Sequence, residues 1–367
     1  MANAILDFKK EFYTDRTKLH LNNAGLSPIS NPAREKIKYW ADRFYNEGFY
    51  TDHDYMNDVL IARKNVAKLV ACDHSEISFY PSTAYAISQL CFQFPLKPND
   101  EVLMWDIEYS SNLYPWQEAC KRSGATLVLA PSKNFQVDTD ELISKITPQT
   151  KVIAISWLQF QTGTRTDLKK VGEVCKQKGI FFFVDIMQGI GMHPFNMKAL
   201  NIDACASGSH KWLVSPVGVG FLALDSKHVM KFKPHNVGAS TFGTCDDPSD
   251  LTCMPKTDSL KFEAGSKQVL EITALGASID LILKTGVENI EKEILRLSSK
   301  LHHGLQNLGF ESFNHQSSIV NFIPRADTEK RLHAIPVLFA KRGNGFRLSP
   351  HAHNNDEDID RVLQALK

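Results

Sequence analysis

The sequence has no apolar run long enough to cross a bilayer, and neither sign of charge is in excess. Its most apolar stretches, such as GIFFFVDIM, fall well short of the ~20 residues that a membrane helix needs. The 42 Lys and Arg residues are balanced by 41 Asp and Glu residues, which gives a formal net charge of +1. Because this balance leaves no excess of positive charge to attract nucleic acid or an anionic membrane, a small molecule is the expected partner.

The sequence also shows no cysteine framework and no nucleotide-binding motif, and a secretory signal is not expected. Its seven cysteines are odd in number and show no paired CxxC spacing, which favours a reducing compartment over a disulfide framework. The N-terminal MANAILDFKKEFYTDRTKL carries charges throughout, unlike a secretory signal, so a cytoplasmic location is expected. Neither GxGxxG after a strand nor GxxxxGK is present, which argues against a nucleotide-dependent α/β enzyme.

Seven short apolar runs do occur between residues 75 and 225, each bounded by polar residues, glycine or proline. Continuous rather than alternating apolar character is typical of strands that are covered on both faces. The sequence therefore predicts an α/β fold with a seven-stranded, mostly parallel sheet and helices on both faces. The expected strands span residues 77–80, 101–105, 126–130, 152–156, 181–185, 204–207 and 220–224.

Capping residues mark some of the helices expected between these strands. Thr166 is expected to cap a helix that ends at Gly179, because apolar residues recur on one face between them. An earlier helix is expected to begin with Asn31 and Pro32 and to end near Gly48.

With 367 residues, the chain is expected to form one large and one smaller domain. Residues 225–265 lose periodicity and gain Pro, Asp, Ser and Thr, which is typical of a long functional excursion. The predicted units are an N-terminal segment at 1–18 that packs on the small domain, a large domain at 19–265 and a small α/β domain at 266–367. The small domain is expected to contain helices at about 267–284, 286–308 and 329–340, strands in SIVNFIP and GFRLS, and a closing helix from about 355.

Polar residues directly after the strands are the first candidates for a site, because open parallel sheets bind ligands beyond the carboxyl ends of their strands. Asp185 ends a very apolar run, so its carboxylate needs a cationic or hydrogen-bonding partner. Taken alone, Asp185 is more simply a loop or helix-capping aspartate. Gln188 follows three residues later, and the pair suggests a heteroaromatic ligand with a protonated ring nitrogen and a ring hydroxylate.

Lys211 lies in GSHKWLVSPVGVGFLAL, after a short polar stretch and before a long apolar stretch. The side chain of a lysine beside a buried strand extends to water, pairs with an acidic residue, or loses its proton and acts in catalysis. For a lysine taken alone, a solvent-exposed side chain is the simplest of these three interpretations. Ser82 and Thr83 begin an amphipathic segment, and a helix N-terminus of this kind binds phosphate. Plain N-capping explains Ser82 equally well.

Pyridoxal phosphate requires this combination of a lysine, an acid, an amide and hydroxyl groups at a helix start. Its aldehyde forms a Schiff base with the lysine, the acid keeps the ring nitrogen charged, and donors hold the phosphate. The sequence resembles the class V aminotransferase family of fold type I pyridoxal phosphate enzymes, which includes cysteine desulfurases, isopenicillin N epimerase-like proteins and, more distantly, kynureninase. The likeness runs from HLNNAGLSPIS at residue 20 to RLSPHAHNNDEDIDRVLQAL at residue 347, nearly the full length.

The resemblance implies roles for residues around the cofactor ring. Lys211 in SHKWL would be the Schiff-base lysine, while Asp185 and Gln188 in VDIMQGIG match the family's contacts to the ring nitrogen and ring oxygen. DIEYSSNLYPW is similar to the segment that stacks an aromatic ring over the cofactor, which selects Tyr109, although a half-buried packing role explains this residue equally. WLQFQTG resembles a substrate-side turn from which Gln159 would approach the cofactor.

The resemblance also implies which residues hold the phosphate. PSTAYAIS resembles the family's phosphate loop, and SGSHK resembles a second phosphate-contacting loop in which Gly208 stands where many relatives have serine. Which serine of that second loop contacts the phosphate therefore stays open. The implied cofactor contacts are Ser82, Thr83, Ala84, His210 and either Ser207 or Ser209.

Two further segments suggest a shared site and a substrate pocket. FEAGSKQ resembles the segment that crosses to a neighbouring subunit, which implies a homodimer in which Ser266 reaches the other cofactor's phosphate. Arg347 in GFRLSPH matches the arginine that holds the substrate α-carboxylate, although an arginine after a strand is often simply exposed. LNNAG could add Asn22, Asn23 or the Gly25 amide to the same carboxylate, or it could be an ordinary turn.

The reaction stays open between amino transfer, epimerisation and β-elimination, with Lys211 as the proton shuttle in each. The family's sulfur-transferring cysteine lies shortly before the carboxylate-binding arginine, where IPVLFAKRGNGFRLS has none. Amino transfer or epimerisation of an amino acid is therefore expected first, with SHKWL and GNGFRLSPH nearer to the epimerase-like branch. The alternatives are a non-catalytic regulator and β-elimination of the desulfurase or lyase type. Of these two types, the desulfurase would need Cys245 or Cys253 to receive the sulfur.

No metal site is expected. The amino acid substrate is not identified by the sequence, and the side chains that could surround it are Tyr114, Trp157, Phe160 and Arg165.

Overall fold

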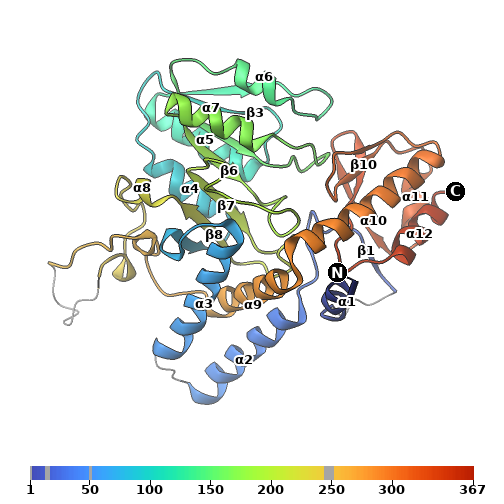
Figure 1. Cartoon of the computed structure of the whole chain (residues 1–367), viewed down its shortest axis with the longest axis horizontal. Helices are drawn as coiled ribbons and strands as arrows, with labels where there is room; N and C mark the ends of the chain where they lie inside the picture. The colour runs from blue at the N-terminus through green and yellow to red at the C-terminus, as the bar shows by residue number, and fades with distance from the viewer. Residues whose placement is uncertain (1, 13–16, 49–51, 244–251) are drawn as a thin grey trace.

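The computed structural model describes residues 2–12, 17–48, 52–243 and 252–367. The large sheet in it has seven strands in the order β2-β8-β7-β6-β5-β3-β4 (Figure 1). β8 runs antiparallel to its neighbours β2 and β7, and the other neighbouring pairs are parallel. The predicted seven-stranded, mostly parallel sheet is thus confirmed. Its strands are β2 (Ile77–Tyr80), β3 (Glu101–Trp105), β4 (Thr126–Ala130), β5 (Thr150–Ser156), β6 (Phe181–Asp185), β7 (Ala204–Gly208) and β8 (Gly220–Leu224).

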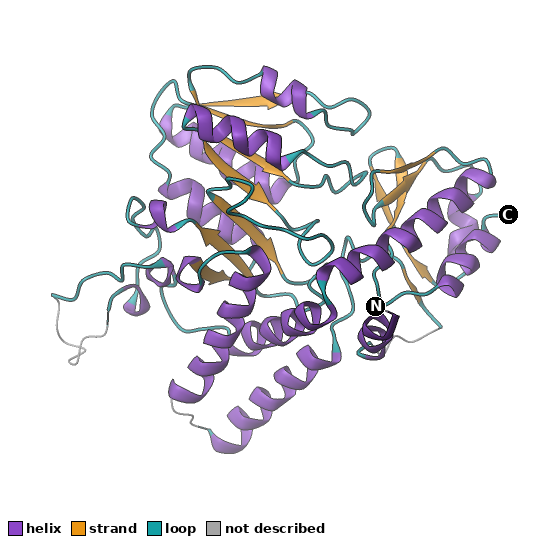
Figure 2. Cartoon of the chain, in the orientation of Figure 1, coloured by secondary structure: helices purple, strands orange, loops and turns teal. Residues whose placement is uncertain are grey.

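Successive side chains of the central strands enter two different hydrophobic cores, one on each face of the sheet. Phe182 and Val184 pack into one core, while Phe181 and Phe183 pack into the other. Figure 2 shows helices on both sides of the sheet. Because both faces are covered, successive positions in the middle of these strands are apolar, which explains the continuous runs. The flanking helices include α4 (Thr83–Gln93), α5 (Ser110–Ser123), α6 (Thr139–Ser144) and α7 (Leu168–Lys178).

The helix boundaries follow their capping residues. Ser30 caps α2 (Asn31–Glu47), and Gly48 ends it with a positive φ of 63°, as predicted. The predicted cap of α7 is wrong by one residue, because the side chain of Asp167 rather than Thr166 accepts a hydrogen bond from the Lys170 amide. The Thr166 hydroxyl instead accepts a hydrogen bond from the Trp105 indole at 3.1 Å.

Helix α9 (Val269–Thr285) packs against α2 and α3 (Asp52–Val70) below the large sheet (Figure 1). A Cβ built on Gly276 would lie 2.6 Å from the Ala62 Cβ, so glycine allows α9 to approach α3 closely. The preceding excursion contains α8 (Ser226–Val229) and 3₁₀ turns at Ala239–Thr241 and Ser259–Phe262, and a further 3₁₀ turn at His74–Glu76 precedes β2.

The smaller C-terminal part contains a four-stranded sheet in the order β12-β13-β10-β9, backed by α10 and α12. The predicted helix at 329–340 is wrong in length: α11 covers only Thr328–His333, and two short strands follow it. Pro336 is the reason, because proline lacks an amide donor and disfavours a helical residue before it. The elements here are α10 (Val287–Asn307), β9 (Ser312–Asn314), β10 (Val320–Phe322), β11 (Val337–Leu338), β12 (Ala340–Arg342), β13 (Gly345–Leu348) and α12 (Asp356–Ala365).

The N-terminal residues contact the C-terminal part of the chain. Helix α1 (Ala2–Lys10) lies beside α9 and α10, and Lys9 forms an ion pair with Glu293 at 2.7 Å. Strand β1 (Leu19–His20) pairs with β11 in parallel. No helix of the described residues is long and apolar enough to cross a membrane.

Candidate active site

A cavity of about 340 Å³ lies at the carboxyl ends of the central strands, where the sequence placed the site. Ser156 ends β5, Asp185 ends β6, and Lys211 follows β7, while Arg347 enters from β13 of the smaller part. The fold therefore brings together side chains that are far apart in the sequence. The predicted residues that line the cavity are Ser82, Thr83, Ala84, Tyr109, Asp185, Gln188, His210, Lys211 and Arg347.

Lys211 forms no ion pair with any acidic side chain in the described part of the chain. Burial lowers the pKa of its amine to about 8, and the positive charge of Arg347 acts in the same direction while Asp185 opposes it. Its Nζ lies 5.5 Å from the centroid of the Tyr109 ring. Lys211 is therefore a partly deprotonated amine inside a cavity rather than a solvated surface lysine.

Asp185 and Gln188 are both held in fixed orientations. The Asp185 side chain is only 5% exposed, its Oδ1 accepts a hydrogen bond from the Met187 amide at 2.8 Å, and burial raises its pKa to about 6. Gln188 Nε2 donates to the Ala24 carbonyl at 3.0 Å, and Gln188 Oε1 accepts from the Trp212 indole at 3.0 Å. A buried carboxylate that forms no ion pair with the described residues favours a ligand that brings a cation, such as a protonated ring nitrogen.

The start of α4 forms the opposite end of the cavity. Ser82 caps this helix by accepting a hydrogen bond from the Tyr85 amide at 3.2 Å, and it also lines the cavity. The capping role of Ser82 is therefore confirmed, and its contact with a phosphate stays a prediction. The first amides of a helix lack partners within it and favour an anion, so this end suits a phosphate.

The second predicted phosphate loop contributes His210 and Lys211 to the cavity lining, and of its predicted phosphate contacts His210 alone lies there. Ser207 and Ser209 are fully buried, and their hydroxyls donate to the carbonyl oxygens of Gly208 and Pro216. Neither serine is among the residues that line the cavity. A Cβ on Gly208 would lie 3.0 Å from Thr83 Oγ1, so a serine there would crowd the start of α4.

Gln159 belongs to a buried network behind the cavity that the sequence analysis missed. Its Nε2 donates to Glu108 Oε1 at 3.3 Å, and Gln159 does not line the cavity. Glu108 also accepts hydrogen bonds from the Ser156 amide at 2.7 Å, from the Ser156 hydroxyl at 2.5 Å and from Asn112 at 2.9 Å. Burial raises the pKa of Glu108 to about 7, although these donors oppose the shift. The network holds the loop that presents Tyr109.

Replacing Glu108 with alanine is expected to lower the free energy of unfolding by about 2–4 kcal/mol, because several buried donors would lose their acceptor. Denaturant unfolding of the purified protein measures the change. Glu118→Ala is the control, since Glu118 is partly exposed and its one ion pair within the described residues is with Arg122, and it is expected to stay within about 0.5 kcal/mol. A change as small as that of the control would exclude a stabilising role for the network.

Tyr109 is 42% exposed, and its ring packs edge-on against Phe160 with centroids 5.0 Å apart. Of the side chains expected around a substrate, Phe160 lines the cavity. Trp157 is buried with Arg165 stacked 5.7 Å from its ring, and Tyr114 is exposed; none of these three lines the cavity.

Arg347 is 1% exposed and pairs with no acid among the described residues. Its Nη1 donates to the Phe160 carbonyl at 2.6 Å and its Nη2 to Asn22 Oδ1 at 3.1 Å, while Nε has no partner. Burial lowers its pKa to about 9, and the nearby Arg342 adds to the effect. Because a buried charge without a counterion is costly, Arg347 favours binding of a carboxylate.

The two neighbouring asparagines have different roles. Asn22 contacts Arg347, whereas Asn23 Nδ2 donates to the Ser349 carbonyl at 2.9 Å and Asn23 does not line the cavity. Gly25 lines it, and a Cβ there would lie 2.8 Å from the Asn22 side chain. Asn23 therefore ties the N-terminal turn to the smaller part of the chain.

Ser266 lies outside this cavity, in a separate depression of about 250 Å³. Two neighbouring cations, Arg63 and Lys267, pair with the buried Glu263. The predicted contact of Ser266 with a partner's cofactor stays a prediction.

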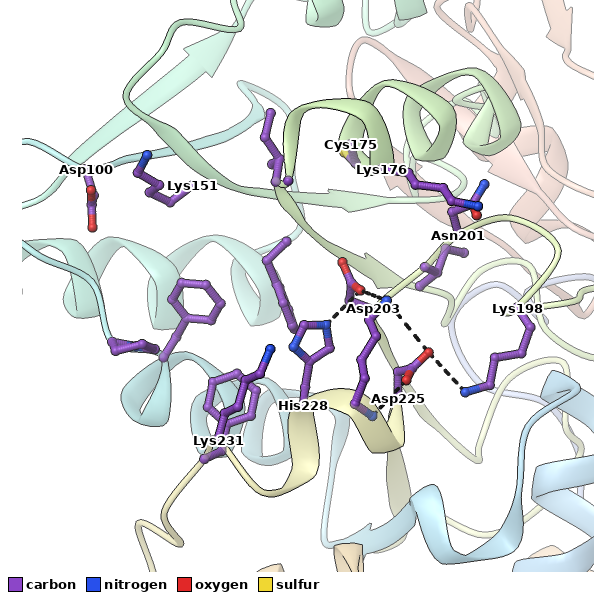
Figure 3. A pocket seen from close by; sticks show the side chains of 18 of the residues that line it. Asp100, Lys151, Cys175, Lys176, Lys198, Asn201, Asp203, Asp225, His228 and Lys231 are labelled. Carbon is purple, nitrogen blue, oxygen red and sulfur yellow. Dashed lines mark hydrogen bonds and ion pairs between the residues drawn. The ribbon is translucent and has the colours of Figure 1, made fainter.

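A larger cavity of about 980 Å³ lies at the opposite, amino-terminal edge of the sheet (Figure 3). Its ionic groups largely satisfy one another, since Lys198 pairs with Asp225 at 3.1 Å and His228 contacts Asp203 at 2.8 Å. None of the predicted site residues lines it. The smaller cavity is therefore the candidate site, because it brings together Lys211, Asp185 and Arg347.

None of the cysteines in the described residues lines the smaller cavity. Contrary to the expectation of reduced cysteines, Cys253 is disulfide-bonded. Cys245 lies outside the described residues. Of the two cysteines considered for sulfur transfer, neither is observed as a thiol at the site.

The family model for aminotransferase class-V matches residues 32–334. A probable cysteine desulfurase of Methanothermobacter thermautotrophicus is 26% identical and matches over 98% of this chain and 97% of its own. A probable cysteine desulfurase of Pyrococcus abyssi is 27% identical over 83% of this chain and 82% of its own. An uncharacterized aminotransferase of Bacillus subtilis is 21% identical over 98% and 96%.

Solved structures show the same fold at low identity. The cysteine desulfurase CsdA of Escherichia coli has a TM-score of 0.88 at 21% identity and covers 98% of this chain and 97% of its own. The cystine C-S lyase C-DES, in complex with its product cysteine persulfide, has a TM-score of 0.86 at 22% identity and covers 95% and 97%. A C-DES mutant with glycine covalently linked to its pyridoxal phosphate cofactor has a TM-score of 0.87 at 20% identity, covering 95% and 96%.

Proposed function

The chain belongs to the aminotransferase class-V family of pyridoxal phosphate enzymes, and we propose that it cleaves the C–S bond of a cystine-type amino acid by β-elimination. One observation carries the proposal: the cavity has a lysine, a buried acid and a buried arginine, but no thiol from the described residues. The names of the relatives favour sulfur chemistry over the amino transfer or epimerisation that was expected first. With no thiol of the described residues placed to receive it, the sulfur leaves with the product.

The residues present fit the cofactor. Asp185 and Gln188 would hold its ring, Ser82 and Thr83 would hold its phosphate at the start of α4, and Tyr109 would cover the ring. When bound, pyridoxal phosphate supplies an aldehyde that joins amino groups and a ring that accepts the electron pair of a Cα–H bond. His210 and the remaining serine contact of its loop stay proposals.

The protein's own groups bind the amino acid and move its proton. Arg347 binds the α-carboxylate, and Asn22 holds the guanidinium in place. Lys211 accepts the Cα proton as its amine, which a pKa near 8 allows at neutral pH. The Cβ–S bond of one half of cystine then breaks and the sulfur leaves with the bonding electrons. With one water added, cystine yields pyruvate, ammonia and cysteine persulfide, so no oxidant is required.

A panel of amino acids tests the reaction. L-cystine and L-cysteine would be incubated with the holoenzyme, and pyruvate, ammonia, alanine and persulfide would be quantified. We expect pyruvate and ammonia in equal amounts, and cysteine persulfide in addition when cystine is the substrate. Alanine as the product would indicate desulfuration instead, a requirement for an added keto acid would indicate amino transfer, and formation of the D-isomer without pyruvate would indicate epimerisation.

Double replacement of Cys245 and Cys253 by serine is expected to leave the rate of pyruvate formation within about two-fold of wild type, because the sulfur does not pass through an enzyme thiol. Pyruvate release and the visible absorbance of the bound cofactor are the measurements. Cys175→Ser is the matched control, since that thiol is buried far from the cavity lining. Loss of sulfur release in the double variant alone would assign the transfer to one of these two cysteines.

The remaining expectations become proposals about assembly. We infer a homodimer in which Ser266 reaches the partner's cofactor, a cytoplasmic location, and the division into segments 1–18, 19–265 and 266–367. Size-exclusion chromatography with light scattering tests the dimer: a monomer with full activity would exclude the role of Ser266.

A further inference from the structure

A second arginine, Arg342, lines the cavity beside the residues already described. It lies at the end of β12 and is exposed, and no acidic side chain of the described residues pairs with it. Its Nη1 donates to the Lys341 carbonyl at 2.8 Å, which leaves the other donors of the guanidinium available.

The strand register places Arg342 and Arg347 on the same face of one hairpin. Ala340 pairs with Arg347 and Arg342 pairs with Gly345 in the antiparallel β12–β13 ladder. Residues directly opposite share a face, and so do residues two positions apart along a strand. Arg342 is therefore a diagonal neighbour of Arg347, with Cβ atoms roughly 7 Å apart. Two guanidinium groups thus enter one cavity from the same surface.

The hairpin that carries Arg342 is fixed at its backbone. Asn321, on the adjacent strand β10, donates from Nδ2 to the carbonyls of both Arg342 and Gln161 at 3.1 Å. The turn after Arg342 contains Gly343 at a φ of 58°, and a Cβ there would lie 3.2 Å from the Phe135 ring. These contacts hold the position of the Arg342 backbone while its side chain remains free to bind.

The charges around the cavity leave Arg342 without an assigned partner. The start of α4 suits the cofactor phosphate, Asp185 suits its ring nitrogen, and Arg347 suits the α-carboxylate. Arg342 is close enough to lower the pKa values of both Lys211 and Arg347 by electrostatic repulsion. A second anion on the substrate would relieve this repulsion.

We propose that Arg342 forms a second carboxylate-binding subsite, and that the substrate is an amino acid whose side chain ends in a carboxylate, as the distal half of cystine does. The proposal rests on the proposed function only in placing an amino acid in this cavity. Arg347 binds the carboxylate common to all amino acids, and Arg342 selects among them.

Two analogues of equal size test the subsite: S-carboxymethyl-L-cysteine, which ends in a carboxylate, and S-carbamoylmethyl-L-cysteine, which ends in a neutral amide. Each would be titrated into the holoenzyme while the visible absorbance of the cofactor is followed, which measures binding whether or not turnover occurs. Wild type is expected to bind the carboxylate at least about ten-fold more tightly, as a charge-assisted contact allows. The kcat/KM for pyruvate formation gives a second readout.

The variant Arg342→Gln is expected to reduce this preference to about two-fold or less, mainly by weakening binding of the carboxylate. Lys341→Gln is the matched control, because Lys341 is the adjacent exposed cation, pairs with Glu329 and does not line the cavity; it is expected to keep the preference. Three results would overturn the subsite: equal binding of both analogues to wild type, no absorbance change with either analogue, or a preference for the carboxylate that survives in Arg342→Gln. A preserved preference without any pyruvate would instead refute the lyase reaction and leave the subsite standing.

Discussion

Replacing Lys211 with alanine is expected to reduce turnover by at least about 10³-fold, because the role proposed for this amine is both to attach the cofactor and to move the substrate proton. No other lysine lines the cavity among the described residues, so none is placed to substitute for it. The measurements are the kcat for pyruvate formation and the visible absorbance of the purified protein. Lys169→Ala, on the exposed side of α7, is the control and is expected to retain wild-type activity.

Two further measurements separate a chemical role of Lys211 from a purely structural one. Lys211→Arg keeps the positive charge but lacks a nucleophilic amine at neutral pH, and it is expected to be as inactive as the alanine variant. A small amine such as methylamine, added to Lys211→Ala, is expected to restore part of the activity by supplying a base to the space vacated. Undiminished turnover in the alanine variant would refute the assignment of the site.

The strands could be predicted because burial on both faces of the sheet requires consecutive apolar residues, and these are visible in the sequence. Each of Phe181, Phe182 and Phe183 enters one of two cores, so the run has no polar alternation. The helix around residues 329–340 could not be predicted correctly, since its length depends on Pro336 and on pairing between β11 and the distant β1. Pairing partners that are far apart in the chain leave no local pattern.

The cavity's main groups could be predicted because they follow strand ends. Asp185 is the last residue of β6 and Lys211 follows the end of β7, where a parallel sheet collects its ligands. Side-chain direction could not be predicted in the same way. Gln159 turns toward Glu108 behind the cavity, and Asn23 turns toward Ser349, although both were expected to reach the ligand. These orientations depend on partners in other elements.

Arg342 is the opposite case, because it lines the cavity although its sequence context does not predict this. In the sequence it is one of several basic residues near a glycine turn, with no feature that separates it from the exposed Lys341. Only the β12–β13 register puts it on the face of Arg347, because a shift of one residue would exchange the faces. Recognition of a second anion is therefore a property of strand pairing rather than of a motif.

Replacing Arg347 with methionine is expected to lower kcat/KM for every amino acid substrate by about 10²–10³-fold, since the charge-assisted contact to the α-carboxylate is lost in a buried position. The loss is expected mainly in substrate affinity, because the contact is made before and during the reaction alike. Steady-state kinetics and absorbance titrations measure both quantities. Arg331→Met, at an exposed residue that pairs with Asp327, is the control and is expected to behave as wild type.

The same substitution is expected not to lower the free energy of unfolding of the substrate-free protein. Arg347 is buried without a counterion among the described residues, and an apolar side chain of similar length removes the cost of burying that charge. The variant would then be as stable as wild type in denaturant yet unable to bind substrate tightly. Arg347 and Arg342 also differ in their expected profiles, since loss of Arg347 weakens all amino acids and loss of Arg342 weakens only those with a second carboxylate. If Arg347→Met kept wild-type affinity, the α-carboxylate would have to bind elsewhere in the cavity, and Arg342 would be the first residue to test.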